Sequence, residues 1–250
     1  GVFPLRDNTF GARPRLLGMQ LGAAWQPDDK LALKLALARY DFRNLQGSAH
    51  NDYADPAYLS GEYERGYRQR GNTLFQINQD PYDPGFLNPV YGLASKFEVQ
   101  AITVGAELGY FAPLHIGFVG ELVRNQGFDE AEILARTGSS LASLDKRNRG
   151  YLYRLTLGDR AVNGRGDWQF ALTYRYLERD ATPDAFTDPD FLLGGTNNKG
   201  YVLGLTYGIA ANTSLGLRYL SAESIDSPTF NPSLAPLRVN TLQFDLNLRF

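Results

Sequence analysis

The sequence predicts an all-β protein, a single antiparallel transmembrane β-barrel domain over residues 1–250. Three observations predict this fold class. Short segments alternate apolar and polar side chains, the polar set is rich in small residues, and short connections between the segments alternate with long ones. A two-residue period is typical of a β-strand with two unlike faces, and a tilted strand needs about ten residues to cross a bilayer.

The alternation is strictest in the last segment, "VNTLQFDLNLRF", at 239–250. Its apolar set is Leu242, Phe244, Leu246, Leu248 and Phe250, and its polar set is Thr241, Gln243, Asp245, Asn247 and Arg249. The pattern alone fits two structures. In a water-soluble sandwich or lipocalin-like barrel the apolar face covers a core, whereas in an outer-membrane barrel it meets lipid and the polar face lines a lumen.

Eight earlier segments repeat the pattern, so that nine strands are predicted. The first alternates Leu and Met with Gly and Gln, the second alternates Leu with Ala and Lys, and the third alternates Ile and Val with Thr, Gly and Glu. The fourth is weaker because Gly120 falls on its apolar face, and the last four alternate Tyr, Trp, Phe and Leu with Gly, Thr and Arg. In chain order the segments are 16–25, 30–40, 100–111, 115–123, 151–158, 167–179, 201–209 and 214–220.

Two properties of these faces favour the membrane. Charged residues on the small, polar face suit a hydrated lumen, where they set ion selectivity; the predicted pore-lining residues are Lys34, Glu107, Glu121, Arg154, Arg175, Arg179, Arg218, Asp245 and Arg249. Aromatic residues lie near the ends of the apolar faces, as in the aromatic girdles at membrane interfaces; these are Trp25, Tyr110, Tyr151, Trp168, Tyr176, Tyr201, Tyr219 and Phe250.

The lumen charges predict a weak preference for anions. Arg154, Arg175, Arg218 and Arg249 come from nearby strands and are expected to form one basic wall, with an acidic patch opposite, where Glu107 and Glu121 face each other across a hairpin. The alternative for each charge is that it only pairs with a neighbour and stabilises the lumen.

The connections give an orientation. Short links at 26–29, 112–114, 162–166 and 210–212 alternate with long ones at 46–97, 128–148, 181–199 and 227–239, as short periplasmic turns alternate with long extracellular loops. If the last strand ends in the periplasm, residues 1–15 start outside the cell. Because single-chain barrels have even strand numbers and Pro4 argues against a further strand, the expectation is the C-terminal part of a larger even-stranded barrel.

The connection at 46–97 is too long for a plain loop. It is rich in Tyr and Asp, and it is expected either to fold inward and constrict the pore or to cover the barrel mouth from outside.

Composition excludes several classes of protein. The formal net charge of -2 gives no basic footprint for nucleic acid, and the absence of Cys excludes disulfides and thiolate metal sites. No segment has the apolar length of a membrane helix, no signal peptide opens the sequence, and nothing indicates a cofactor.

Three motifs suggest other chemistry, and each has a plainer explanation. "NDYAD" and "TDPDF" could hold Ca²⁺ through carboxylates, but neither has the EF-hand form and Asp before Pro is common in turns. "LLGGTNNKGY" lacks the ending of a phosphate loop and is expected to be an extracellular turn. His50, near Ser48 and Asp52, and His115 are the only histidines, so a hydrolase is disfavoured and no catalytic residue is predicted.

Several stretches together resemble a bacterial porin family, in its C-terminal half. They are "YGLASKFEVQ", "EILARTG", "RGDWQFALTYRYLERDATPDAFTDPDF", "GGTNNKGYVLGLTYG", "NTSLGLRYLSAESID" and "LQFDLNLRF", and the resemblance runs from about Leu16 onward. Members of that family are usually longer, with further strands ahead of this stretch. The resemblance implies an outer-membrane channel for small solutes or ions, in contact with lipid, and porins are commonly homotrimers. The alternative function is that of a barrel that acts as a scaffold or sleeve for a partner protein.

Overall fold

The computed structural model describes residues 1–5, 13–49, 61–66, 68–78, 89–137, 141, 144–226 and 235–249. Within these ranges, no helix is long and apolar enough to cross a membrane. The strands and helices are β1 (Val2–Pro4), β2 (Arg15–Asp28), β3 (Leu31–Arg43), β4 (Leu74–Gln76), β5 (Tyr91–Leu93), β6 (Phe97–Phe111), β7 (Leu114–Asn125), α1 (Glu130–Thr137), β8 (Arg149–Gly158), β9 (Trp168–Leu177), the 3₁₀ turns η2 (Asp184–Phe186) and η3 (Phe191–Leu193), β10 (Asn198–Ala210), β11 (Thr213–Ser224) and β12 (Arg238–Leu248).

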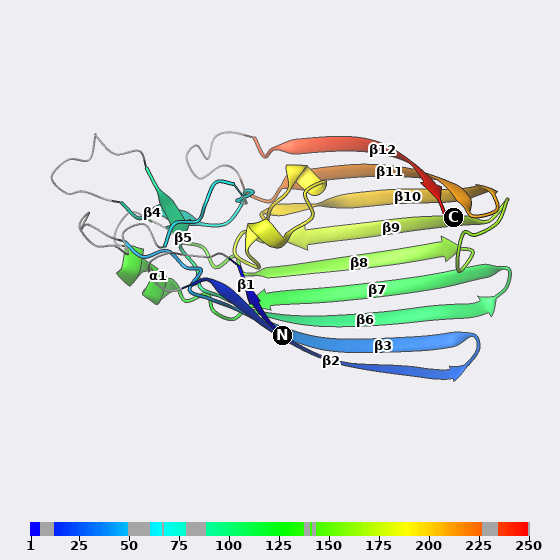
Figure 1. Ribbon diagram of the computed structural model, residues 1–250, viewed down its shortest axis with the longest axis horizontal. Coiled ribbons are helices and arrows are strands. Elements are labelled where there is room, and N and C mark those ends of the chain that lie inside the picture. Colours follow the sequence, from blue (N-terminus) through cyan, green and yellow to red (C-terminus); the bar gives the residue numbers. More distant parts are fainter. Residues whose placement is uncertain are drawn as a thin grey trace.

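One antiparallel sheet dominates the molecule, and its ten strands pair in the order β1-β2-β3-β6-β7-β8-β9-β10-β11-β12. The all-β antiparallel prediction is therefore confirmed, and each of the nine predicted strands corresponds to one of β2, β3 and β6 to β12. The small strands β4 and β5 pair with each other beyond one end of the large sheet (Figure 1), and Leu93 of β5 also forms a parallel bridge with Gln46.

The two ends of the sheet differ as the connections predicted. Residues 29–30, 112–113, 159–167 and 211–212 link strands at the end where the chain finishes, and residues 44–96, 126–148, 178–197 and 225–237 link strands at the other end (Figure 1). The turn at 159–167 is the longest of the first group. Its Asp167 carboxylate accepts backbone N–H groups from Asn163 (3.0 Å) and Gly164 (2.7 Å), and these hydrogen bonds lower the pKa of Asp167.

A short strand near the N-terminus corrects one expectation. β1 pairs with the start of β2, with Val2 opposite Leu17 and Pro4 opposite Arg15. The amide of Leu5 donates to Pro14 (3.0 Å), and Gly1 and Gly18 exchange hydrogen bonds. Because hydrogen-bonding positions alternate along a strand, the backbone nitrogen of Pro4 faces away from β2. Proline is tolerated at such a position on an edge strand, so it was wrong to take Pro4 as evidence against a strand.

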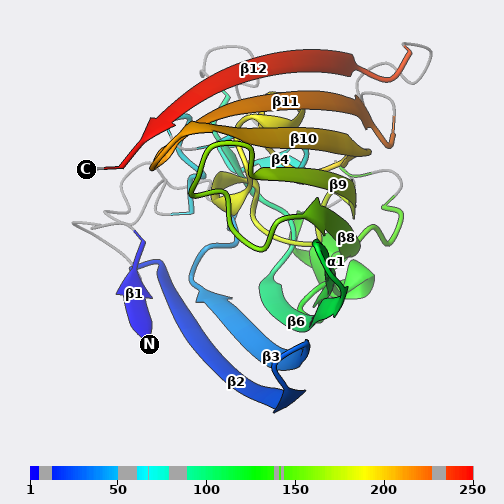
Figure 2. The same ribbon diagram turned by 90° about the vertical axis from the view of Figure 1, so that its right-hand side faces the viewer.

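The sheet curves around a central space (Figure 2). Among the described residues, β12 has no strand partner on its outer edge, and β1 covers only the first residues of β2. The structure thus shows a strongly curved, open sheet of ten strands, and closure into a barrel is not observed.

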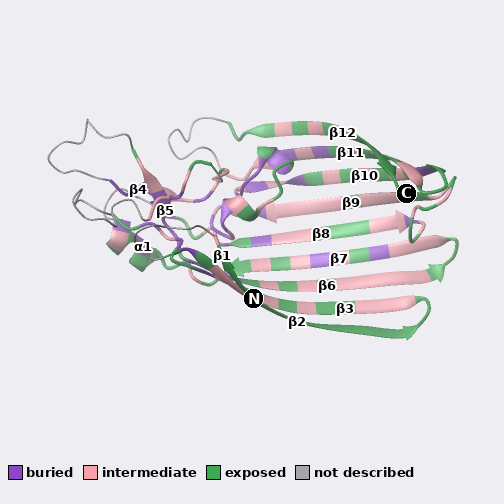
Figure 3. Ribbon diagram, viewed as in Figure 1, coloured by how far each residue is buried: buried purple, intermediate pink, exposed green. Residues whose placement is uncertain are grey.

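Exposed and half-buried residues alternate along strands such as β10 and β12 (Figure 3), so the two faces of the sheet differ in exposure. On β10 the convex face presents Tyr201, Leu203, Leu205 and Tyr207, whose exposed fractions are 53%, 39%, 43% and 47%. The residues between them are Val202, Gly204 and Thr206, and all three are half-buried. A water-soluble barrel would bury this apolar set, whereas a membrane barrel presents it to lipid.

The buried clusters lie at the end with long connections. Phe75, Ile77, Ala94, Phe128, Ile133 and Leu144 form one cluster that joins α1 to the β4–β5 hairpin. Asn125 of β7 is fully buried beside it. Its side-chain amide donates to the carbonyls of Lys96 (2.9 Å) and Asp180 (3.0 Å), and its carbonyl accepts from the amides of Glu98 and Gly127. Three of the long connections are therefore fixed to one another.

Candidate functional site

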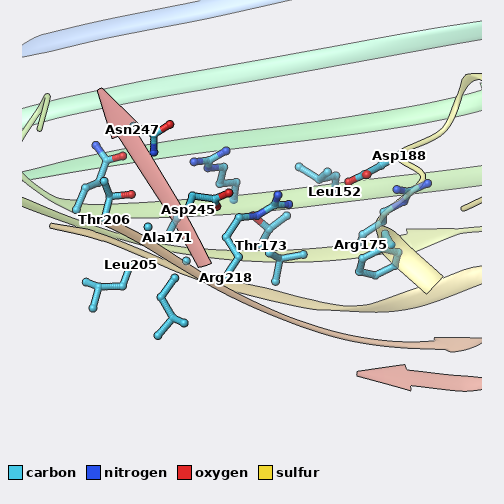
Figure 4. Close-up of a pocket in the computed structure, with 17 residues that line it drawn as sticks. Leu152, Ala171, Thr173, Arg175, Asp188, Leu205, Thr206, Arg218, Asp245 and Asn247 are labelled. Carbon is cyan, nitrogen blue, oxygen red and sulfur yellow. The ribbon is translucent and has the colours of Figure 1, made fainter. Parts of the chain in front are cut away.

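The concave face of strands β8 to β12 carries three arginines. Arg154 lies opposite Thr173, two residues along β9 from Arg175, and Arg218 lies opposite Gly204. The small partners Thr173 and Gly204 leave room for the long side chains. Together with Asp245 and Asp188 the three arginines line a cavity of about 380 Å³, and Leu205 projects from the opposite side of the strands (Figure 4).

A second cavity of about 450 Å³ lies over the other half of the concave face. Strands β2, β3, β6 and β7 contribute small and polar residues to its wall, among them Gln20, Ala36, Thr103 and Glu121, and also Tyr40, Val99 and Val123. The hydroxyl of Thr103 donates to Glu121 (3.4 Å), which lies directly opposite it.

The β9–β10 connection, residues 178–197, lies between the two cavities. Phe191 lines the first cavity, Thr182, Phe186 and Thr187 line the second, and Asp188 lines both. Arg175 also lines both. In the view along the strands, this connection, drawn in yellow, lies inside the curve of the sheet (Figure 2).

Apolar contacts fix one side of the connection to strands β11 and β12. Phe191 and Leu192 are buried against Leu220 and Ala222 of β11. The side-chain amide of Gln243 on β12 donates to Asp190 (3.0 Å).

The other side of the connection reaches across to β3 and to the β3–β6 connection. The ring of Phe186 lies 5.3 Å from the ring of Phe42 on β3. The hydroxyl of Tyr63 donates to the carboxylate of Asp184, and the carbonyl of Asn72 accepts the Asp184 amide (2.7 Å). Burial raises the pKa of Asp184. The connection is therefore held on both sides of the lumen rather than only at its ends.

Arg175 is held by this connection. Its guanidinium lies over the ring of Phe191, 5.1 Å from the centroid, and donates to the carbonyl of Gly195 (3.5 Å). The guanidinium groups of Arg154 and Arg218, by contrast, make no hydrogen bond or ion pair with the described part of the chain. Two unpaired cations facing a cavity can hold mobile anions there.

A model of the family described as "Putative porin" matches residues 1–250. The chain belongs to this porin family. The match begins at residue 1, ahead of the stretch that carried the resemblance in the sequence. No curated protein matches the chain. Membership implies a place in the bacterial outer membrane and passage of small solutes, and it agrees with the exposed apolar belt described above.

The prediction that Glu107 and Glu121 of this porin face each other in an acidic patch was wrong. The β6–β7 hairpin places Glu107 opposite Gly117 and Glu121 opposite Thr103, so the two carboxylates are four residues apart along the hairpin, about 13 Å at the rise of a β-strand. Glu107 lies instead beside His115, with 3.4 Å between Oε2 and Nδ1. Lys34 faces Gly105 of β6 and lies on the same face.

Two of the predicted pore-lining arginines, Arg179 and Arg249, lie outside this cavity. Arg179 follows the end of β9, and its guanidinium is 3.5 Å from Asp226 in the β11–β12 connection. Arg249 follows β12, where its side chain donates to Asn163 (3.2 Å) in the turn before β9. Neither lines the cavity of Arg154, Arg175 and Arg218, so the expected basic wall has three members instead of four.

The aromatic residues of the porin form two groups on the strands. Trp25, Tyr110 and Trp168 are exposed near the short turns. Towards the other end lie Tyr151, Tyr176, Tyr201 and Tyr219, and the rings of Tyr151 and Tyr176 stack with centroids 5.0 Å apart. Phe250 lies outside the described residues.

The described residues contain no group of three or more His, Asp or Glu side chains that could hold a metal ion. "NDYAD", His50 and Asp52 fall outside the described residues. In "TDPDF", the amide of Asp190 donates to the Asp188 carboxylate (3.0 Å), which is turn geometry. "LLGGTNNKGY" includes part of η3 and leads into β10.

The residues that bring the β9–β10 connection inward were not predicted from the sequence. Phe186, Phe191 and Leu192 are large apolar residues within a stretch with no strand period. An apolar cluster inside a predicted loop indicates burial against another element, and that signal could have identified this connection.

Proposed function

We propose that this porin forms a water-filled channel through the bacterial outer membrane, in which the β9–β10 connection narrows the lumen and the arginine wall favours anions. The observation that carries the proposal is the position of Arg175 and Asp188, which line both concave cavities at the connection. A solute that moves from one cavity to the other passes these two side chains.

Closure of the sheet in the membrane is part of the proposal. The convex belt is apolar, and a sheet edge in lipid leaves N–H and C=O groups that each cost several kcal/mol. The free edges of β2 and β12 are therefore expected to find strand partners. The homotrimer stays a prediction, since nothing in the described residues identifies its interface.

The anion preference rests on the unpaired guanidinium groups of Arg154 and Arg218. The acidic residues on the same cavity are Asp188 and Asp245, so cations exceed carboxylates by one when Arg175 is counted. A small excess of fixed positive charge in a narrow lumen gives weak anion selectivity.

Planar-bilayer recordings test the proposal. Stepwise conductance and a reversal potential that shows chloride preference in a KCl gradient are expected. The double variant Arg154→Gln and Arg218→Gln should keep the conductance and lose the preference. A protein that inserts but shows no conductance would contradict the channel and favour a sleeve around a partner protein.

A sleeve has less support from the structure. The β9–β10 connection occupies the concave space where a partner would lie, and its contacts with β3, β11 and β12 are internal.

A further inference from the structure

The convex face carries an unusual pair of arginines at the end with long connections. Arg124 of β7 lies directly opposite Arg149 of β8. Both residues are exposed, and neither side chain makes a hydrogen bond or ion pair within the described chain. Like charges directly opposite each other destabilise a sheet, so an anion that bridges them would be stabilising.

The carboxylate of Glu178 forms no ion pair with either arginine. Glu178 accepts the backbone amide of Arg149 (2.8 Å), and its other oxygen lies 3.9 Å from the guanidinium of Arg147. The Arg149 side chain remains free on the convex face.

Positive charge continues along the same end of the sheet. Lys199 of β10, Glu223 of β11 and Arg238 of β12 lie in one row, where Glu223 bonds both Lys199 (3.3 Å) and Arg238 (2.5 Å). One carboxylate between two cations leaves a net positive charge. This row borders a convex cavity of about 390 Å³, to which Tyr174 and Tyr201 also contribute.

Stacked tyrosines join the two basic groups. Tyr151 is two residues from Arg149, and it stacks on Tyr176, which lies opposite Lys199. Arg124, Arg149, Lys199 and Arg238, with these tyrosines, are termed the basic band.

Apolar side chains continue from the basic band along the same face. Leu122 is two residues from Arg124 and is 49% exposed, and Leu203 and Leu242 lie one row beyond Tyr201. On β8 and β10 the face changes from cationic to aromatic to apolar, and on β10 Lys199, Tyr201 and Leu203 make this change within about 13 Å. A free anion needs only the cations, whereas a lipid with a phosphorylated headgroup matches all three zones.

We propose that the basic band binds the phosphate groups of an anionic glycolipid in the outer leaflet, with the acyl chains on the apolar rows below. The site rests on the proposed orientation in the outer membrane, with the long connections outside. One phosphate bridges Arg124 and Arg149, and Lys199 and Arg238 lie at the other end of the basic band.

The test compares two double variants with the same loss of charge. Arg124→Gln with Arg149→Gln alters the basic band, and Arg154→Gln with Arg218→Gln alters the concave face. Purified protein in detergent is titrated with a bisphosphorylated glycolipid, with the same glycolipid after phosphatase treatment and with inorganic phosphate, and bound lipid is measured by native mass spectrometry. Folding of each variant is checked by its heat-dependent gel mobility.

The convex variant is expected to bind the bisphosphorylated glycolipid about tenfold more weakly, the scale of one lost charged hydrogen bond, and to keep wild-type conductance and ion preference. The concave variant should bind the glycolipid like the wild type, keep its conductance and lose the ion preference. Equal binding by wild type and the convex variant, equal binding of the dephosphorylated lipid, or full competition by inorganic phosphate would overturn the lipid site. A change in oligomeric state without a change in lipid binding would assign the band to a subunit contact and also overturn it. Each of these outcomes is independent of whether the protein conducts.

Discussion

The β3–β6 and β9–β10 connections lie at the same end of the sheet and differ in where they go. The β3–β6 connection is by far the longer, yet its described residues form a hairpin beyond the strand ends and pack against α1. The shorter β9–β10 connection crosses the concave face and contacts both β3 and β11. The difference shows that loop length does not determine which connection crosses the concave face.

The two connections are nevertheless coupled. The backbone amide and the hydroxyl of Thr73, in the β3–β6 connection, donate to the buried carboxylate of Asp180 (2.9 and 2.6 Å). Asn72 donates to the carbonyls of Arg179 and Thr182. The β3–β6 connection therefore stabilises the β9–β10 connection through these hydrogen bonds.

Removal of the inward connection should have the largest effect. When a short Gly-Ser link replaces residues 183–193, we expect a severalfold rise in single-channel conductance, because Phe186, Asp188 and Phe191 no longer occupy the lumen. Planar-bilayer recordings measure this. An unchanged conductance would mean that the narrowest point lies elsewhere, for instance in the β3–β6 connection.

Loss of one aromatic anchor should loosen the connection without removing it. Phe191→Ala is expected to cost about 3 kcal/mol of local stability, as for other buried Phe to Ala changes, and to release Arg175 from its ring contact. Hydrogen exchange of residues 184–195 should become faster and current noise should rise. Leu193→Ala, in the same turn but 59% exposed, is the control, and equal effects of the two variants would argue against the anchor.

The contribution of Asp180 to the stability of the folded protein should depend on pH. Burial raises the pKa of this carboxyl to about 6 from an ordinary value of 3.8. The folded protein therefore retains a proton that the unfolded chain loses; the resulting stabilisation is complete below about pH 4 and is lost as the pH rises through about 6. Two pH units correspond to about 3 kcal/mol.

We therefore expect a higher unfolding temperature at pH 5 than at pH 7.5 in detergent. Asp180→Asn should reduce this difference, because its oxygen can still accept the Thr73 amide but it no longer titrates. Asp188→Asn, an exposed carboxylate on the same connection, should keep the wild-type difference. A pH dependence that survives in Asp180→Asn would assign the titration to another group.

A charge on the cavity wall of β7 should have the smallest effect. Glu121→Gln removes one carboxylate from the second cavity and keeps the contact with Thr103. We expect the chloride preference to rise slightly with little change in conductance, as measured by reversal potentials. A shift towards cations would contradict the assignment of Glu121 to the ion path.

The strands were predictable because their signal is local. The alternation of apolar and polar residues within a segment such as 201–209 depends only on residues that are neighbours along the chain. In the structure this segment lies in β10. The prediction that Glu107 faces Glu121 was wrong because the register between two strands depends on the turn that joins them. The tight hairpin centred on 112–113 places Gly117 opposite Glu107.

The inward connection was not predictable from periodicity. Phe186 meets Phe42, and Phe191 meets Leu220, across large sequence separations. Such contacts leave no repeat in the sequence, only apolar residues in an apparent loop. β1 was missed for a different reason, since three residues that include Pro4 are too few to show alternation.

In the proposed channel, ions pass Asp188 at the inward connection. The chain contains no Cys, so Asp188→Cys provides a single reactive thiol, and Leu203→Cys on the convex face is its matched control. We predict that a bulky, water-soluble thiol reagent reduces the conductance of open Asp188→Cys channels stepwise, that a reductant restores it, and that Leu203→Cys channels are unaffected. Full conductance after complete modification of Asp188→Cys would contradict the claim.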